Sequence, residues 1–207
     1  MVKVVIFDFD DTLYNTNIWR DWSIFCENKF EGCLNDCISI EVDKFLDKYN
    51  LRGEVDGSMV ANSIVEETGS DRAWETLRNS FFKKATDISF VDNKIIRDFS
   101  SVFKLYIVSH SSKCFIKNFS KQYNFDLGCF QGIMGSEDEV IGLKNTKKQA
   151  FENVIKLEKI NPNDLVVLGD SENKDLIPAR ELGAFGYLIN SINDINENLL
   201  EKLKSIK

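Results

Sequence analysis

The chain lacks most of the features that mark membrane, secreted or disulfide-rich proteins. None of its 207 residues belongs to an apolar run near the roughly 20 residues that a transmembrane helix needs. The apolar opening Val4–Phe7 stops at Asp8, Asp10 and Asp11, so we do not expect a signal peptide. Five cysteines are an odd number without a disulfide-framework pattern, which is typical of a reducing compartment. We therefore expect a cytoplasmic protein with no membrane partner.

Positive charge is also scarce. The sequence has 26 Lys and Arg against 33 Asp and Glu, a net charge of −7, and a single histidine. A surface of this sign repels the phosphate backbone of nucleic acids, so we expect no nucleic-acid partner. Residues 15–95 hold ten basic and fifteen acidic side chains, whereas the rest of the chain is nearly balanced. This uneven distribution is a first indication of two modules.

Short apolar runs predict the strands of a buried sheet. They lie at Val2–Phe7, Leu105–Val108, Leu165–Leu168 and Ala184–Ile189, with a weaker run at Phe130–Met134. A continuous β-branched run is typical of a strand covered on both faces. Helical patterns alternate with these runs along the chain, which predicts an α/β fold with a parallel sheet.

Residues 15–95 show helical spacing with no strand pattern. Four apolar groups carry the pattern: Ile18, Trp22, Phe25, Cys26; Ile38, Val42, Phe45, Tyr49; Val60, Ile64; and Trp74, Leu77, Phe81. We expect an all-helical insert at 15–95 within an α/β core formed by residues 1–14 and 96–207.

The strongest chemical signal follows the first predicted strand. Asp8, Asp10 and Asp11 place three carboxylates within four residues, where ligands bind in open α/β sheets. Mg²⁺ prefers such hard oxygen ligands. In an extended segment Asp8 and Asp10 would face the same side, so that one could attack a phosphorus atom and the other could transfer a proton. The alternative is an ordinary acidic loop after a strand.

Three further elements fall at or near later strand ends. Ser109 ends the strand Leu105–Val108, and its hydroxyl could bind a phosphoryl oxygen. Asp170 and Asp175 follow the strand Leu165–Leu168 through Gly169, and Asp170 could complete a metal site begun by Asp8.

A helix start lies before that strand. Thr146 and Gln149 fit a capping box. This prediction puts Lys147 in the first helical turn, where its ammonium group could meet a phosphate.

In this order, these residues resemble the motifs of the haloacid dehalogenase (HAD) superfamily of phosphohydrolases. The first motif, DxDx(T/V), matches Asp8, Asp10 and Thr12, and the last, an acidic GDxxx(x)D loop, matches Asp170 and Asp175. Ser109 and a lysine near a helix start supply the two between. The resemblance implies a Rossmann-like parallel sheet with an inserted helical cap that excludes bulk water.

The resemblance also implies residue roles. Asp8 would be the nucleophile that forms an aspartyl phosphate, and Asp10 would be the general acid and base. Mg²⁺ would be held by Asp8, Asp170 and the backbone carbonyl of Asp10. Ser109 and Lys147 would bind phosphate, and Asp175 would orient the lysine or a metal-bound water. The expected substrate is a small phosphorylated metabolite: a sugar phosphate, a phosphoglycolate-like ester or a nucleoside monophosphate.

Several alternatives stay open. Lys144 competes with Lys147, since they lie 26 and 23 positions before Asp170 and relatives place this lysine about 23 to 25 before. His110, directly after Ser109, is either a residue that contacts the substrate or a residue of the loop without a role in binding. A phosphomutase of the same fold, similar to β-phosphoglucomutase, would keep every motif, and a non-catalytic binding module is a third possibility. A dehalogenase usually lacks the aspartate found here as Asp10.

Overall fold

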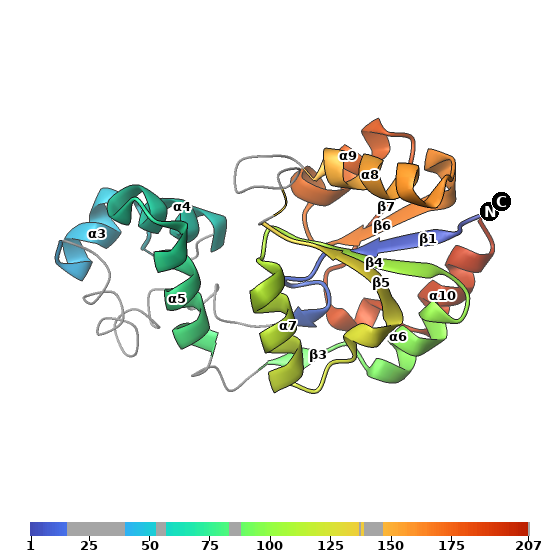
Figure 1. The fold of residues 1–207 in the computed structure, drawn as a ribbon, viewed down its shortest axis with the longest axis horizontal. Coiled ribbons are helices and arrows are strands. Elements are labelled where there is room, and N and C mark those ends of the chain that lie inside the picture. The colour runs from blue at the N-terminus through green and yellow to red at the C-terminus, as the bar shows by residue number, and fades with distance from the viewer. Residues whose placement is uncertain (16–39, 53–56, 83–87, 137, 139–146, 207) are drawn as a thin grey trace. The chain divides into compact units, whose positions relative to one another are not determined.

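The computed structural model describes residues 1–15, 40–52, 57–82, 88–136, 138 and 147–206. Their contacts divide the chain into two compact units, Met1–Asn15 with Ser89–Lys207, and Thr16–Ile88. Figure 1 labels the helices and strands.

The first unit is built on a five-stranded sheet in which every pairing is parallel, in the order β5-β4-β1-β6-β7. These strands are β1 (Val4–Phe7), β4 (Lys104–Val108), β5 (Phe130–Met134), β6 (Leu165–Gly169) and β7 (Phe185–Leu188). The predicted α/β fold with a parallel sheet is thus confirmed, including the weaker run at β5.

Helices cover both faces of this sheet (Figure 1). α8 (Lys148–Glu158) and α9 (Ile177–Glu181) lie on one face, while α6 (Asn93–Ser100) and α10 (Glu197–Lys204) lie on the other. The remaining helix among the described residues of this unit is α7 (Lys113–Gln122). Short 3₁₀ turns occupy Leu127–Cys129, Pro162–Asp164 and Ile192–Asp194, and a π-helical turn occupies Glu172–Leu176.

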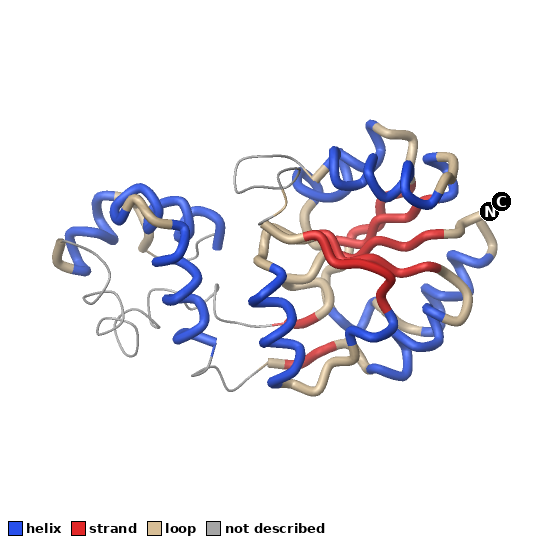
Figure 2. Tube along the Cα trace, viewed as in Figure 1, coloured by secondary structure: helices blue, strands red, loops and turns tan. Residues whose placement is uncertain are grey.

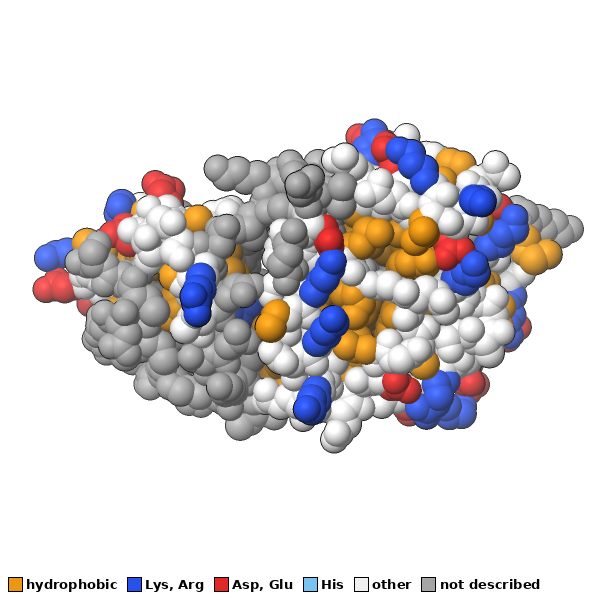
Figure 3. Space-filling view, viewed as in Figure 1, with side chains coloured by type: hydrophobic (Ala, Val, Ile, Leu, Met, Phe, Trp, Pro, Cys, Tyr) orange, Lys and Arg blue, Asp and Glu red, His pale blue; other side chains and the backbone are white. Residues whose placement is uncertain are grey.

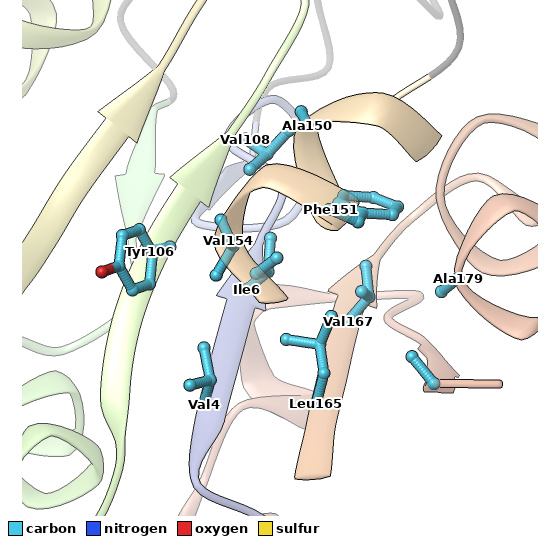
Figure 4. Packing of buried hydrophobic residues seen from close by; sticks show 11 residues of the cluster. Val4, Ile6, Tyr106, Val108, Ala150, Phe151, Val154, Leu165, Val167 and Ala179 are labelled. Atoms are coloured by element: carbon cyan, nitrogen blue, oxygen red, sulfur yellow. The ribbon is translucent and has the colours of Figure 1, made fainter. Parts of the chain in front are cut away.

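The central strand β1 is buried along its whole length because its alternate side chains meet both helical layers. Val4 and Ile6 pack with Phe151 and Val154 of α8 in the core shown in Figure 4. On the opposite face Phe7 meets Phe99 of α6 edge to face, at 5.9 Å between ring centroids. This two-sided packing explains why the strand is continuously apolar in sequence.

The second unit contains the described helices α3 (Val42–Lys48), α4 (Gly57–Thr68) and α5 (Asp71–Phe82). Several side chains that the helical spacing identified are buried, namely Phe45, Val60, Ile64, Trp74 and Leu77. Leu46 and Ala61 are buried as well although the spacing did not identify them, and Tyr49 is only half-buried. The group Ile18 to Cys26 lies outside the described residues.

The chain leaves and re-enters the sheet unit through a small antiparallel ladder. β2 (Tyr14–Asn15) pairs with β3 (Ser89–Phe90), and the path is easy to follow in Figure 2. β3 and the start of α6 therefore belong to the sheet unit, although the sequence pattern grouped residues 89–95 with the insert. A two-residue strand is too short to leave an alternating signal. No helix among the described residues is long and apolar enough to cross a membrane.

Candidate active site

Three of the sequence-identified residues lie at the carboxyl ends of adjacent strands. Asp8 follows β1, Ser109 follows β4 and Asp170 follows β6. Because β4, β1 and β6 are neighbouring parallel strands, these ends share one edge of the sheet. Asp8 is held in line with the sheet, since its N–H donates to the carbonyl of Leu168 at 2.9 Å.

Lys147 forms ion pairs with two aspartates at this edge, Asp8 and Asp175. Its Nζ lies 2.8 Å from Asp8 Oδ1 and 2.6 Å from Asp175 Oδ1. The lysine is 1 % exposed and Asp175 is fully buried. A buried ammonium group of this kind is tolerated only when carboxylates surround it.

The start of α8 differs from the predicted capping box. Lys147 itself is the N-cap, without a side-chain cap, and its carbonyl accepts the N–H of Phe151 at 3.0 Å. Thr146, the predicted N-cap, lies outside the described residues, as does Lys144. Lys147 therefore precedes the first helical turn, where it had been expected, and its side chain contacts the carboxylates from the helix boundary.

Asp175 reaches this position because the chain after β6 makes a π-helical turn over Glu172–Leu176. Its Oδ2 accepts the N–H of Ser171 at 3.2 Å. A Cβ on Gly169 would lie 2.5 Å from Asp175 Cγ, which is closer than real side chains approach. Only glycine at position 169 leaves room for the buried carboxylate beneath it.

Neighbouring carboxyl groups and loss of solvent change the pKa values at this edge, both for buried Asp8 and for Asp170, which keeps an exposed surface. Burial raises the pKa of Asp8 well above its ordinary value; Lys147 opposes this, while Asp175, Asp170 and Asp10 add to it. Desolvation, followed by the neighbouring Asp175, raises the pKa of Asp170 to about 6. Burial alone would lower the pKa of Lys147, but Asp175 and Asp8 outweigh it and raise that pKa.

Asp8, Asp170 and Asp175 form a carboxylate group suited to a cation. One oxygen from each lies within 4.8 Å of the other two. Three carboxylates and one ammonium group leave an excess of two negative charges when all are ionised, which a divalent cation would balance. Hard carboxylate oxygens are the ligands that Mg²⁺ takes. The residues present therefore fit a magnesium ion.

The metal ligands predicted from the sequence are Asp8, Asp10 and Asp170, with Asp175 in support. The carboxylate group that the described residues form contains Asp175 and not the side chain of Asp10. The resemblance assigns Asp10 to the metal through its backbone carbonyl, which leaves its carboxylate for other contacts.

The side chain of Asp10 accepts hydrogen bonds from three hydroxyl groups. Tyr14 donates to Oδ1 at 2.5 Å, and Ser109 donates to Oδ2 at 3.1 Å. Ser111 also donates to Oδ2, and its N–H donates to Ser109 Oγ at 3.0 Å. Tyr14 and Ser111 were missed by the sequence analysis. A serine two positions beyond Ser109 was the available signal for Ser111, and the place of Tyr14 directly after the aspartate motif was the signal for the tyrosine.

The segment that carries Asp10 is a turn, not the extended chain assumed from the spacing. The N–H of Leu13 donates to the carbonyl of Phe9 at 3.1 Å, and Asp11 has a φ of 53°. Aspartate is among the residues that tolerate this left-handed conformation. The turn gives Asp8 and Asp10 different partners while Asp10 remains near enough to affect the pKa of Asp8.

His110 is half-buried at the end of β4.

One family model matches most of the chain. A family model described as "Hydrolase: haloacid dehalogenase-like hydrolase" matches residues 2–183. No curated protein matches the chain.

Several solved structures share the fold at low sequence identity. A HAD phosphatase from Thermococcus onnurineus superposes with a TM-score of 0.63 at 18% identity, over 96% of this chain and 98% of that one. A predicted phosphoglycolate phosphatase from Haemophilus somnus gives 0.58 at 14% identity, over 100% and 98%. A HAD family enzyme from Bacteroides thetaiotaomicron, in complex with magnesium and inorganic phosphate, gives 0.55 at 19% identity, over 91% and 94%. At these identities the likeness concerns the fold alone.

Proposed function

The chain belongs to the haloacid dehalogenase-like hydrolase family, and we propose that it is a Mg²⁺-dependent phosphatase acting on a small phosphomonoester. The observation that carries the proposal is the contrast between two aspartates of one motif. Asp8 is paired with the buried ammonium group of Lys147, whereas Asp10 is surrounded by the hydroxyl groups of Tyr14, Ser109 and Ser111. A neighbouring cation favours the ionised form of a carboxyl group, which is the form that attacks, and donors on both oxygens orient a carboxyl group for proton transfer.

The proposed reaction has two steps. A carboxylate oxygen of Asp8 forms a bond to phosphorus as the bond to the leaving oxygen breaks, and Asp10 donates its proton to that oxygen. Asp10 then takes a proton from a water molecule whose oxygen attacks the phosphorus, so that the bond to Asp8 breaks and phosphate is released. Each step leaves Asp10 in the protonation state that the next one needs.

Asp8, Asp170 and the backbone carbonyl of Asp10 would hold Mg²⁺, with Asp175 beside them. When bound, the cation supplies positive charge that favours ionised Asp8 and stabilises the negative charge on the phosphoryl group. The buried ammonium group of Lys147 would stabilise the same negative charge, and Ser109 has its hydroxyl group at the end of β4. Asp175 fixes Lys147 by its 2.6 Å contact.

The charge distribution supports a compact substrate. Residues 15–95 carry an excess of five acidic side chains, and the described surface in Figure 3 shows basic side chains intermixed with acidic ones. Attraction for phosphate is then local to the site, while extended polyanions are repelled. A sugar phosphate, a phosphoglycolate-like ester or a nucleoside monophosphate fits these conditions. The family neighbours include dehalogenases, but Asp10 favours the phosphatase reaction.

The test is a panel of phosphomonoesters assayed for released phosphate with Mg²⁺ and with excess chelator. We expect turnover of at least one small ester with Mg²⁺ and none with chelator. Asp8→Asn keeps the shape but removes the attacking charge, so its rate should fall at least about a thousandfold, or roughly 4 kcal/mol of barrier. A wild-type protein inactive on the whole panel, or an active Asp8→Asn variant, would contradict the proposal. Conversion of a hexose 1-phosphate into the 6-phosphate would indicate the mutase instead.

A further inference from the structure

We propose that Tyr14 is a positioning residue that holds the proton-transferring carboxylate of Asp10 in its working orientation. This inference rests on the proposed function, because it assigns Asp10 the transfer of a proton to the leaving oxygen. The hydroxyl of Tyr14 donates to Asp10 Oδ1 at 2.5 Å, whereas Ser109 and Ser111 donate to Oδ2. Donors on both oxygens determine the rotation of the carboxyl group as well as its place.

The tyrosine is itself immobilised by packing. Its side chain is fully buried. The ring lies 5.1 Å from that of Phe9, 5.4 Å from that of Phe90 and 4.9 Å from that of Phe119, measured between centroids. A ring enclosed on several sides has a single orientation, so packing holds its hydroxyl in one position as a hydrogen-bond donor.

The backbone of Tyr14 is equally constrained. It lies in β2 and pairs with Phe90 of β3, where the chain leaves and re-enters the sheet unit. The N–H of Val91, next along the chain, donates to the carbonyl of Leu13 at 2.9 Å. Two segments about 75 residues apart in sequence thus clamp the turn that carries Asp10. Tyr14 connects this clamp to the carboxylate.

The consequence depends on the leaving group. An alkoxide leaves as a strong base and needs the proton of Asp10 in the first step, whereas p-nitrophenolate is weakly basic and leaves without one. General acid catalysis by a positioned group contributes about 10²- to 10⁴-fold. Without the hydrogen bond from Tyr14, the carboxyl group of Asp10 should lose part of this rate contribution. The loss of rate should therefore appear with alkyl esters and not with the nitrophenyl ester.

The experiment compares kcat/KM of Tyr14→Phe for two substrates: an alkyl phosphomonoester turned over by the wild type, and p-nitrophenyl phosphate. Phenylalanine keeps the packed ring and removes only the hydroxyl. We expect about a tenfold loss on the alkyl ester and less than about twofold on the nitrophenyl ester. The ratio of the two values does not depend on how much of the variant is folded, so a loss of stability cannot imitate the result.

Tyr106→Phe is the matched control. It removes another tyrosine hydroxyl of the same unit, which donates to Glu158 away from the strand ends, and it should leave the substrate ratio unchanged. Equal losses on both esters in Tyr14→Phe, or no loss on either, would overturn the positioning role while the activity of the wild type still supported the phosphatase. An inactive wild type would instead overturn the proposed function.

A second measurement tests whether Tyr14 acts through Asp10. In an Asp10→Asn background the proton donor is already gone, so adding Tyr14→Phe should change alkyl ester hydrolysis by less than about twofold. If the two substitutions multiply their effects instead, Tyr14 acts on the reaction by another route and the proposal is wrong.

Discussion

Replacing Gly169 by alanine should damage the site through a single methyl group. The added Cβ would lie 2.5 Å from Cγ and Oδ2 of Asp175, and ordinary contacts begin near 3.4 Å, so the carboxylate must move by about 0.9 Å. The backbone at Gly169 is not one of the described glycines with a positive φ, so alanine is not strained there on its own account. The predicted effect is therefore the displacement of Asp175.

The magnitude follows from the contacts that Asp175 would lose. Its Oδ1 lies 2.6 Å from Lys147 Nζ, and its Oδ2 accepts from Ser171 N–H at 3.2 Å. A shift of this size breaks at least one of them in a fully buried place, which costs about 1.5–3 kcal/mol of unfolding free energy. Misplacement of a catalytic geometry by about 1 Å lowers the rate about a hundredfold.

Thermal melting and a Mg²⁺ titration of phosphate release measure the two effects. The control is Gly132→Ala, whose Cβ would also be crowded, at 3.0 Å from a ring carbon of Tyr106, but on β5. We expect the control to keep its activity per folded molecule. If Gly169→Ala keeps the wild-type kcat/KM and Mg²⁺ requirement, then the position of Asp175 does not govern the site and the reasoning fails.

Two further predictions concern charge. Lys147→Met should destabilise the protein by about 3–5 kcal/mol and abolish turnover, since it leaves Asp8 and Asp175 without their buried cation; added Mg²⁺ should restore part of the melting temperature. The neighbouring control, Lys148→Met, loses only a surface ion pair and should stay within about 0.5 kcal/mol. Hydrogen bonds from Lys104 and Tyr106 hold the pKa of Glu158 below its ordinary value. Ionised Glu158 therefore stabilises the folded protein above the unfolded-state pKa of about 4.3, and this stabilisation is lost as the pH falls through the lower folded-state pKa. Glu158→Gln should therefore cost about 0.5–1 kcal/mol at pH 7 in chemical denaturation and nothing at a pH below that folded-state value; a cost that is the same at both pH values would contradict this assignment.

Local sequence patterns were enough to predict the sheet and the edge at which chemistry is expected. A strand such as Val4–Phe7 can be continuously apolar only when helices cover both of its faces, so its pattern identifies a central parallel strand. Asp8, Ser109 and Asp170 then fall at one edge because parallel strands end on the same side. These inferences need only local spacing and the direction of the chain.

Which side chains meet at that edge depends on contacts between distant parts of the chain. Lys147 and Asp175 are 28 residues apart, and their contact depends on a π-helical turn and on the missing side chain of Gly169. Tyr14 reaches Asp10 only because the chain turns at Asp11.

The β2–β3 ladder has no sequence signal, because strands of two residues are too short for a pattern. Spacing along a chain predicts where an element runs, whereas the direction of a side chain past the end of a strand depends on turns and packing between residues far apart in sequence.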